Sequence, residues 1–155
     1  MKYLLLFGFI LFLNGCSKER MTLYYANLKN TTSHKIEIRP YFNGIVPSEK
    51  IIVLLPNDIK QIAEGTMRGI SGYGFISGYF GGPNDSVIIV FDNTFLITHY
   101  FNTPTSLNSK HYLFSSKRNI GNPESYKIIS TDISKYKREN RHTYEFKEQD
   151  YLDAK

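Results

Sequence analysis

The chain has 155 residues, a formal net charge of +5 at neutral pH, and a composition that is 41% hydrophobic and 15% aromatic. So many apolar and aromatic residues exclude an intrinsically disordered chain, and the length suits one domain rather than two. The single cysteine, Cys16, excludes an internal disulfide and a zinc site built from several cysteines.

The first twenty residues have the pattern of a cleavable export signal. Lys2 gives a positive start, Tyr3–Leu13 is an apolar run of 11 residues, and charged residues follow from Lys18. A run of this length falls within the range of a signal-peptide core and is well short of the roughly 20 residues that a membrane-spanning helix needs. We therefore expect residues 1–15 to be a lipoprotein signal peptide that is removed during export.

The end of the apolar run predicts a site of lipid attachment. Leu13–Cys16 resembles a bacterial lipobox, in which signal peptidase II cleaves between Gly15 and Cys16 after the thiol has been linked to diacylglycerol. The resemblance implies a covalent diacylglycerol and an N-acyl chain such as palmitate on Cys16, and no other cofactor. One acyl chain holds a protein only marginally, whereas two or three hold it permanently. The alternative is an inert Cys16 buried in an N-terminal helix.

The residues after Cys16 bear on the destination of the protein. Ser17 resembles the second residue of lipoproteins that are sent on to an outer membrane. Lys18–Arg20 partly resembles the signal, a lysine followed by acidic residues, that takes Bacteroidetes-type lipoproteins to the cell surface. We expect residues 16–20 to form a lipidated tether in the cell envelope, at the outer membrane in preference to the inner one. Both faces of that membrane stay open as locations.

The first strand patterns follow the tether. Thr22–Leu28 reads as a strand, and Lys35–Phe42 begins with the polar and apolar alternation of a strand with one solvated face. Pro40 indicates an edge strand or a bulge, because proline donates no backbone hydrogen bond. Ile51–Leu55 is continuously apolar, so we expect it to be buried on both faces, with Ile59–Ala63 pairing back onto it.

The clearest predicted element is a hairpin. Ser86–Phe91 and Thr94–Phe101 are rich in β-branched and aromatic residues, and only Asp92 and Asn93 separate them. Two turn-forming residues between such runs predict a type I′-like turn. Shorter strands are expected at Tyr112–Ser115, Tyr126–Thr131 and His142–Phe146, and one or two helical turns at Lys147–Ala154, where acidic residues near the start favour a helix.

These patterns predict an all-β fold: an antiparallel β-sandwich or small barrel of about eight short strands, with a short helical turn at the C-terminus. No linker divides residues 21–155, which we expect to form a single β domain. Two stretches, Asp85–Asn93 and Thr143–Phe146 followed by Asp150–Ala154, resemble segments of small, uncharacterised lipoproteins from Bacteroidetes-type bacteria. The resemblance implies an envelope habitat and a β fold but no activity.

The sequence contains no recognisable catalytic constellation, so we predict a non-catalytic protein. The four histidines lack the spacing of zinc ligands, and no metal site is predicted. The glycine-rich stretch Gly69–Gly82 has neither the Gly-Lys-Ser/Thr of a phosphate loop nor a Gly-x-Ser-x-Gly elbow. It is either a glycine-interrupted strand whose aromatic residues pack across the sheet or a flexible aromatic loop that stacks on a sugar or peptide. In the second case Tyr73, Tyr79 and Phe80 are candidate ligand contacts.

Basic residues concentrate late in the domain. Residues 110–141 contain eight basic and three acidic residues, whereas residues 17–109 are close to neutral. Such a region is either solvated charge around an ordinary hairpin or a surface for anionic lipid or an acidic partner. The candidate contacts are Lys117, Arg118, Lys137 and Arg138.

The sequence therefore predicts a lipid-anchored protein of the cell envelope that acts as a non-catalytic binding or structural module. Its expected partners are the membrane, through the lipid anchor, and an envelope protein or glycan, whereas an exported protein is not expected to bind nucleic acid. Two alternatives stay open: an inhibitor or immunity lipoprotein that blocks a toxin or lysozyme, and a small hydrolase acting on glycans or peptides.

Overall fold

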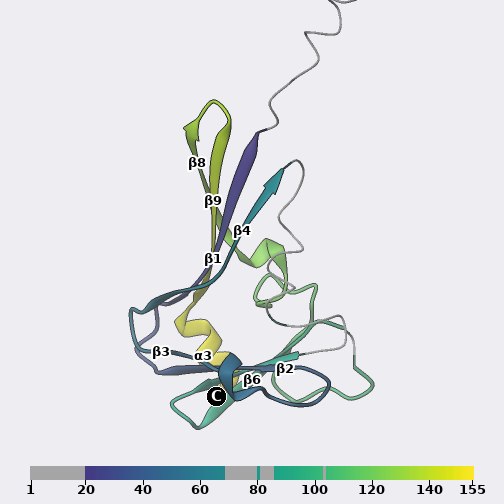
Figure 1. Cartoon of the computed structure of the whole chain (residues 1–155). Coiled ribbons are helices and arrows are strands. Elements are labelled where there is room, and N and C mark those ends of the chain that lie inside the picture. Colours follow the sequence, from purple (N-terminus) through teal and green to yellow (C-terminus); the bar gives the residue numbers. More distant parts are fainter. Residues whose placement is uncertain (1–19, 69–79, 81–85, 103) are drawn as a thin grey trace, which may run out of the picture.

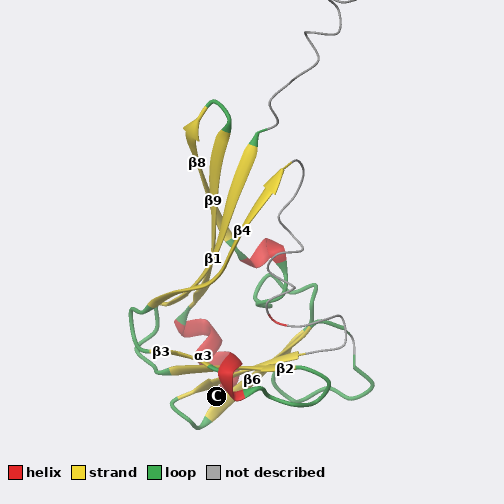
Figure 2. Cartoon of the chain, viewed as in Figure 1, coloured by secondary structure: helices red, strands yellow, loops and turns green. Residues whose placement is uncertain are grey.

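The computed structural model describes residues 20–68, 80, 86–102 and 104–155, most of them in strands (Figures 1 and 2). Two 3-10 turns, η1 (Ser48–Lys50) and η2 (Pro123–Ser125), and the α-helix α3 (Glu148–Ala154) accompany the strands. One sheet contains, in spatial order, β4 (Ile59–Arg68), β1 (Met21–Asn30), β9 (Lys137–Phe146) and β8 (Lys127–Ser134). The other contains β3 (Ile52–Leu54), β2 (Ile36–Tyr41), β5 (Ser86–Phe91), β6 (Phe95–Tyr100) and β7 (His111–Tyr112).

The all-β prediction is confirmed in its sandwich-like form, but the two sheets are mixed rather than purely antiparallel. β1 and β9 run parallel from Met21 opposite Lys137 to Asn30 opposite Phe146, and β6 and β7 are also parallel. The other strand pairs are antiparallel. Within the described part of the chain both sheets keep open edges, so no barrel closes.

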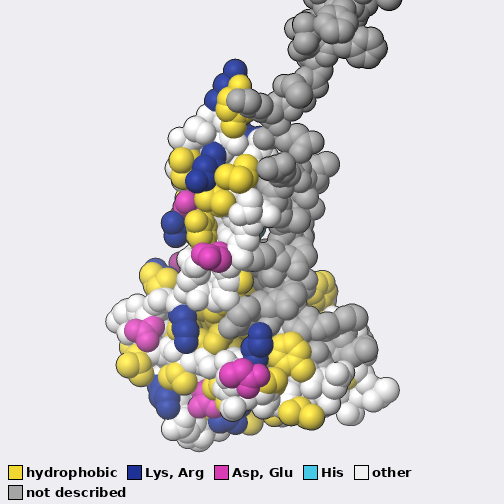
Figure 3. Space-filling model, in the orientation of Figure 1, with side chains coloured by type: hydrophobic (Ala, Val, Ile, Leu, Met, Phe, Trp, Pro, Cys, Tyr) yellow, Lys and Arg dark blue, Asp and Glu magenta, His cyan; other side chains and the backbone are white. Residues whose placement is uncertain are grey.

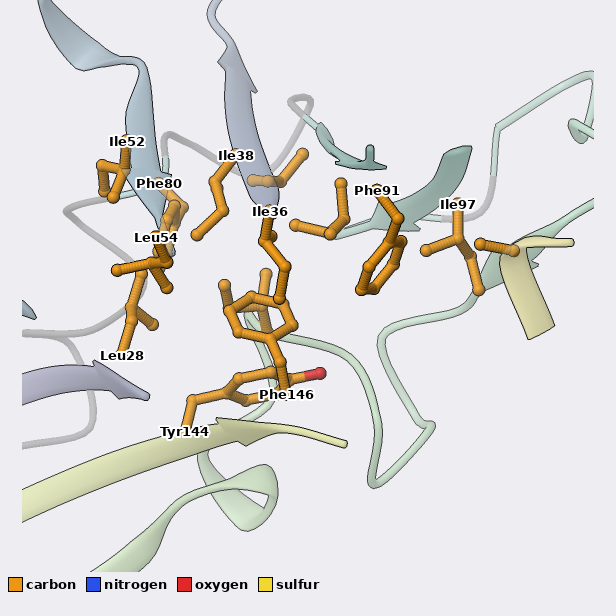
Figure 4. Packing of buried hydrophobic residues seen from close by; sticks show 14 of the residues in the cluster. Leu28, Ile36, Ile38, Ile52, Leu54, Phe80, Phe91, Ile97, Tyr144 and Phe146 are labelled. Atoms are coloured by element: carbon orange, nitrogen blue, oxygen red, sulfur yellow. The ribbon is translucent and has the colours of Figure 1, made fainter. Parts of the chain in front are cut away.

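The core lies where one end of the four-stranded sheet meets the five-stranded sheet, and the other end of the four-stranded sheet extends beyond it (Figures 1 and 3). Leu28 of β1 and Tyr144 and Phe146 of β9 pack against Ile36 and Phe91 of the second sheet (Figure 4). All five side chains are fully buried. Removing such side chains from water is the main favourable contribution to folding, at about 25 cal/mol for each Å² of apolar surface.

Two predictions for the middle of the chain are wrong. Ile51–Leu55 is not buried on both faces, because β3 is an edge strand in which Val53 is 43% exposed between the buried Ile52 and Leu54. Ile59–Ala63 does not pair back onto β3. It begins β4, which belongs to the other sheet and pairs with β1.

The hairpin and the position of Pro40 agree with the sequence patterns. Asp92 and Asn93 have φ angles of 49° and 59°, and a type I′ turn requires positive values at both central residues. The amide of Thr94 donates a 2.9 Å hydrogen bond to the carbonyl of Phe91 and closes the turn. Pro40 pairs with β5 but lies beyond the residues of β2 that pair with β3, so it occupies a local edge.

His34, in the turn between β1 and β2, connects α3 to the turn between β5 and β6. Its ring stacks on Tyr151 of α3 with centroids 3.6 Å apart, and its two nitrogens lie 2.5 Å from a carboxylate oxygen of Asp92 and 3.1 Å from one of Glu148. Burial opposes the charged ring, but the hydrogen bonds to Asp92 and Glu148 outweigh it and raise the pKa of His34 above its ordinary value. The hydrogen bond from His34 in turn lowers the pKa of Asp92. When it is protonated, His34 therefore holds α3 as a cation between two carboxylates.

This contact predicts a pH-dependent contribution to stability. Because the folded pKa of His34 is raised, its contribution is complete below the unfolded pKa of about 6.5 and is lost as the pH rises through the folded pKa. We expect His34→Gln to lower the free energy of unfolding by about 1 kcal/mol at pH 6 and by less at pH 9, measured by urea denaturation. His111→Gln is the matched control, because His111 bonds to the carbonyl of Asn108 rather than to a carboxylate. A loss at His34 that is equal at both pH values would contradict this account.

Candidate binding surface

The β8–β9 hairpin forms the end of the four-stranded sheet that is farthest from the core (Figure 1). β8 is the last strand in the order of this sheet, and all eight of its residues are exposed. The half of β9 that follows the turn, Lys137–Arg141, contains no buried residue, whereas Tyr144 and Phe146 in its other half enter the core. We refer to residues 127–141 as the hairpin surface.

Apolar side chains occur on both faces of β8. Successive residues of a strand point to opposite faces, so Ile128 and Ile129 lie on different sides of the sheet, and they are 45% and 52% exposed. Nearer the turn, Ile133 and Tyr136 are 53% and 44% exposed. An edge strand with exposed β-branched residues offers a partner both backbone hydrogen-bonding groups and apolar contact. This combination makes the hairpin surface the best candidate for a binding surface.

Several charges of the hairpin surface are paired with one another. Nε of Arg138 donates a 2.8 Å hydrogen bond to Asp132, which also forms an ion pair with Arg20 just before β1. The hydrogen bonds from Arg138 and then Arg20 hold the pKa of the Asp132 carboxyl well below its ordinary value. Nε of Arg141 similarly donates a 2.5 Å hydrogen bond to Glu139. The pairs of Asp132 join β8 to β9 and to the residue before β1, whereas Arg141 and Glu139 both belong to β9.

The turn of the hairpin carries two lysines beside an aromatic ring. Nζ of Lys135 lies 5.5 Å from the ring centroid of Tyr136, and Lys137 follows. Neither lysine forms an ion pair with another residue in the described part of the chain. The carbonyl of Tyr136 accepts a 2.9 Å hydrogen bond from the amide of Met21. The turn therefore lies next to the first residue of β1.

The structure divides the predicted basic contacts into two groups. Lys137 and Arg138 belong to the hairpin surface, where Lys137 has no carboxylate partner among the described residues and Arg138 pairs with Asp132. Lys117 and Arg118 lie in the loop between β7 and η2, with Lys117 exposed and Arg118 partly buried. The four residues therefore do not form one patch.

Arg118 is held by the fold itself. Its Nε donates a 2.9 Å hydrogen bond to one carboxylate oxygen of Asp150, and a second guanidinium nitrogen pairs with the other oxygen. The same group donates a 3.1 Å hydrogen bond to the carbonyl of Glu145 and lies 5.4 Å from the ring centroid of Tyr144. Asp150 is buried and also accepts a 2.7 Å hydrogen bond from the amide of Lys147 at the start of α3. These contacts make Arg118 a link between its loop, β9 and α3 rather than a ligand contact.

The remaining predicted residues fall elsewhere. Phe80 is fully buried in the core, so it is not a surface contact for a ligand. Its burial agrees with the packed interpretation of the glycine-rich stretch, but Phe80 is helical, so the expected strand is wrong at this residue. Gly15, Cys16, Tyr73 and Tyr79 lie outside the described residues.

Two histidines near the core stay neutral. Burial lowers the pKa of His99 to about 3, and its Nδ1 accepts a 2.9 Å hydrogen bond from the amide of Ile120. Burial also lowers the pKa of His142, whose ring lies 5.9 Å from that of Tyr24. A neutral imidazole can bind a metal. Among the residues that the structure describes, however, no three His, Cys, Asp or Glu side chains gather as a metal site would require.

A shallow pocket of about 230 Å³ opens on β1 and β4, on the four-stranded sheet. The carboxylate of Glu64 is the single one in its described lining. The guanidinium of Arg141 lies 4.9 Å from the ring centroid of Tyr25, which also belongs to the lining. Tyr25 and Glu64 of this lining are opposite each other in the antiparallel pairing of β1 with β4. The lining consists of Leu23, Tyr25, Glu64, Gly65 and Thr66.

Comparison with known proteins adds no assignment: no protein family, no curated protein and no solved structure matches the chain. None of the helices in the described ranges has the length and apolar character that crossing a membrane demands.

The exposed isoleucines of β8 are functional candidates that the sequence patterns did not single out. Ile128, Ile129 and Ile133 give β8 the composition of a half-buried strand. The available signal was the neighbouring run Lys137–Arg141, in which every residue is charged or polar. Ile129 is opposite Arg141 of this run, so it has no apolar cross-strand partner and is left exposed.

The exposure of β8 predicts that two isoleucine-to-alanine substitutions change the free energy of unfolding by different amounts. Ile129→Ala should change the free energy of unfolding by less than about 1 kcal/mol, because the side chain is already half in water. Ile38→Ala, in the fully buried core, should lower it by about 2–5 kcal/mol. Urea denaturation of both variants gives the comparison. A loss at Ile129 as large as that at Ile38 would show that β8 is covered in the folded protein.

Proposed function

We propose that the chain is a lipid-anchored protein of the cell envelope that acts as a non-catalytic binding module. The observation that carries this proposal is Leu13–Cys16, a lipobox-like sequence placed directly after an apolar run of signal-peptide length. A diacylglycerol thioether and an N-acyl chain on Cys16 would anchor the protein, at the outer membrane in preference to the inner one.

The short distance between Cys16 and the domain supports a position at the membrane surface. β1 begins at Met21, five residues after Cys16. An extended chain spans at most about 3.6 Å per residue, so the lipid-bearing residue and the start of the first strand are no more than about 18 Å apart. The domain would therefore be held against the bilayer rather than on a long linker.

The hairpin surface supports a binding role. Its edge strand leaves backbone groups on one side without a strand partner in the described sheet, and Ile128 and Ile129 offer apolar contact on both faces. Extended protein segments bind such edges by adding a strand. An envelope protein is therefore a suitable partner for β8, and a glycan that stacks on Tyr25 in the neighbouring pocket is the other partner class.

The lipid anchor is tested by Cys16→Ser. We expect the wild-type protein to incorporate labelled palmitate and to fractionate with membranes, and the mass of its first peptide should show a chain that begins at an acylated Cys16. The Cys16→Ser variant should lose the label and leave the membrane, because its only cysteine is absent. Ser17→Ala is the neighbouring control and should keep both properties. A wild-type protein that retains residues 1–15, or that carries a free thiol at Cys16, would overturn the proposal.

A further inference from the structure

We propose that the turn of the β8–β9 hairpin, residues 133–138, is a second membrane contact that binds the anionic headgroups of bilayer phospholipids. We call these residues the hairpin tip. Lys135 and Lys137 supply positive charge to the headgroups, and Tyr136 and Ile133 supply apolar surface at the interface. This inference rests on the lipid anchor at Cys16 proposed above.

The position of the hairpin tip is the first reason. The amide of Met21 donates a 2.9 Å hydrogen bond to the carbonyl of Tyr136, and Met21 is opposite Lys137 in the parallel pairing of β1 and β9. The start of β1 and the hairpin tip therefore lie side by side at the end of the molecule that is farthest from the five-stranded sheet (Figure 1). Met21 is the fifth residue after Cys16, so a lipid on Cys16 keeps Tyr136 within roughly 20 Å of the bilayer.

The charge of the hairpin tip is the second reason. Lys135 and Lys137 have no carboxylate partner among the described residues, whereas Arg138 and Arg20 share the single carboxylate of Asp132. Four basic groups against one acid give this end a net positive charge, and Figure 3 shows Lys and Arg side chains beside hydrophobic ones there. Charges act on a membrane surface only within about 8 Å at physiological ionic strength. The short tether limits the lysines to within roughly 20 Å of the bilayer and so permits the approach at which this attraction acts.

The apolar residues of the hairpin tip are the third reason. Ile133 and Tyr136 are about half exposed at a place where the core of the protein does not reach. Tyrosine is enriched at membrane interfaces because its ring is apolar and its hydroxyl is polar, and lysine side chains extend from the interface into water. A tyrosine between two lysines fits this boundary better than it fits bulk water.

Two attachment points would fix the orientation of the protein. The lipid alone lets the domain rotate about its tether, whereas the lipid and the hairpin tip together hold the sheet upright on the bilayer. The five-stranded sheet would then lie farthest from the membrane. The part of β8 that contains Ile128 and Ile129 would remain accessible from the side.

The contact can be tested on the lipidated mature protein, because lipid occupies the only cysteine and an introduced cysteine can be labelled by itself. Ser134→Cys places an environment-sensitive fluorophore on the hairpin tip, and Ser48→Cys places it on η1, where the serine is also exposed. In vesicles of phosphatidylethanolamine and phosphatidylglycerol we expect the emission of the fluorophore at position 134 to shift to the blue and to be quenched by spin-labelled lipid. The fluorophore at position 48 should show neither effect. In vesicles of phosphatidylcholine the quenching at position 134 should be weaker.

Charge reversal separates headgroup binding from mere proximity. Lys135→Glu with Lys137→Glu should weaken the contact more than about fivefold for each lysine, because about fivefold corresponds to the loss of one positive charge and each substitution also adds a negative one. Lys60→Glu with Lys117→Glu changes the net charge equally at exposed positions outside the hairpin tip and should leave the quenching unchanged. Three results would each overturn the inference while leaving the anchor intact. The signals at positions 134 and 48 could be equal, or the quenching could be unchanged by the charge reversal. The third is a shift at position 134 that occurs only when an envelope protein is added. A Cys16 without lipid in the mass spectrum of the same sample would instead overturn the proposed function, and this inference with it.

Discussion

The parallel pairing of β1 with β9 is the contact on which the rest of the structure depends. It joins the first strand of the domain to the last over the whole length of both, and β4 and β8 attach only to its outer sides. The same two strands supply Leu28, Tyr144 and Phe146 to the core, so completing the sheet and filling the core are one event. Bringing together segments more than a hundred residues apart is entropically unfavourable until those contacts form, which favours cooperative folding.

This pairing also determines what the end of the four-stranded sheet can do. Because β1 starts beside the turn of the hairpin, the proposed lipid anchor and the hairpin tip share one end of the sheet, and the core occupies the other. The polar half of β9 cannot contribute to a core, so the strand that pairs with it, β8, is left exposed. An exposed edge is a liability for a freely diffusing protein but a usable surface for one held at a membrane.

The sequence predicted the elements whose causes are local and failed where the cause lies far along the chain. The hairpin at Asp92 and Asn93 follows from two turn residues between β-rich runs, and the C-terminal helix from an acidic first turn. The destination of Ile59–Ala63 depends instead on β1, and the continuous apolar run at Ile51–Leu55 does not reveal that it becomes an edge strand.

The candidate site shows the same division. Charge density alone identified Lys137 and Arg138, but it could not distinguish them from Arg118, whose partner Asp150 comes from the distant helix α3. The exposure of Ile129 depends on its partner β9, which follows β8 directly in the sequence, so the polar run Lys137–Arg141 was a local signal for it.

The claim that the fold depends on the pairing of β1 with β9 is tested most directly by amide hydrogen exchange under native conditions. The account predicts that the paired amides of β1 and the core half of β9 exchange together, at the slowest rate in the domain and only through global unfolding, whereas amides on the outer edge of β8 exchange orders of magnitude faster. Amides of β1 that exchange early while β5 and β6 stay protected would show that the five-stranded sheet folds without this pairing, and would contradict the account.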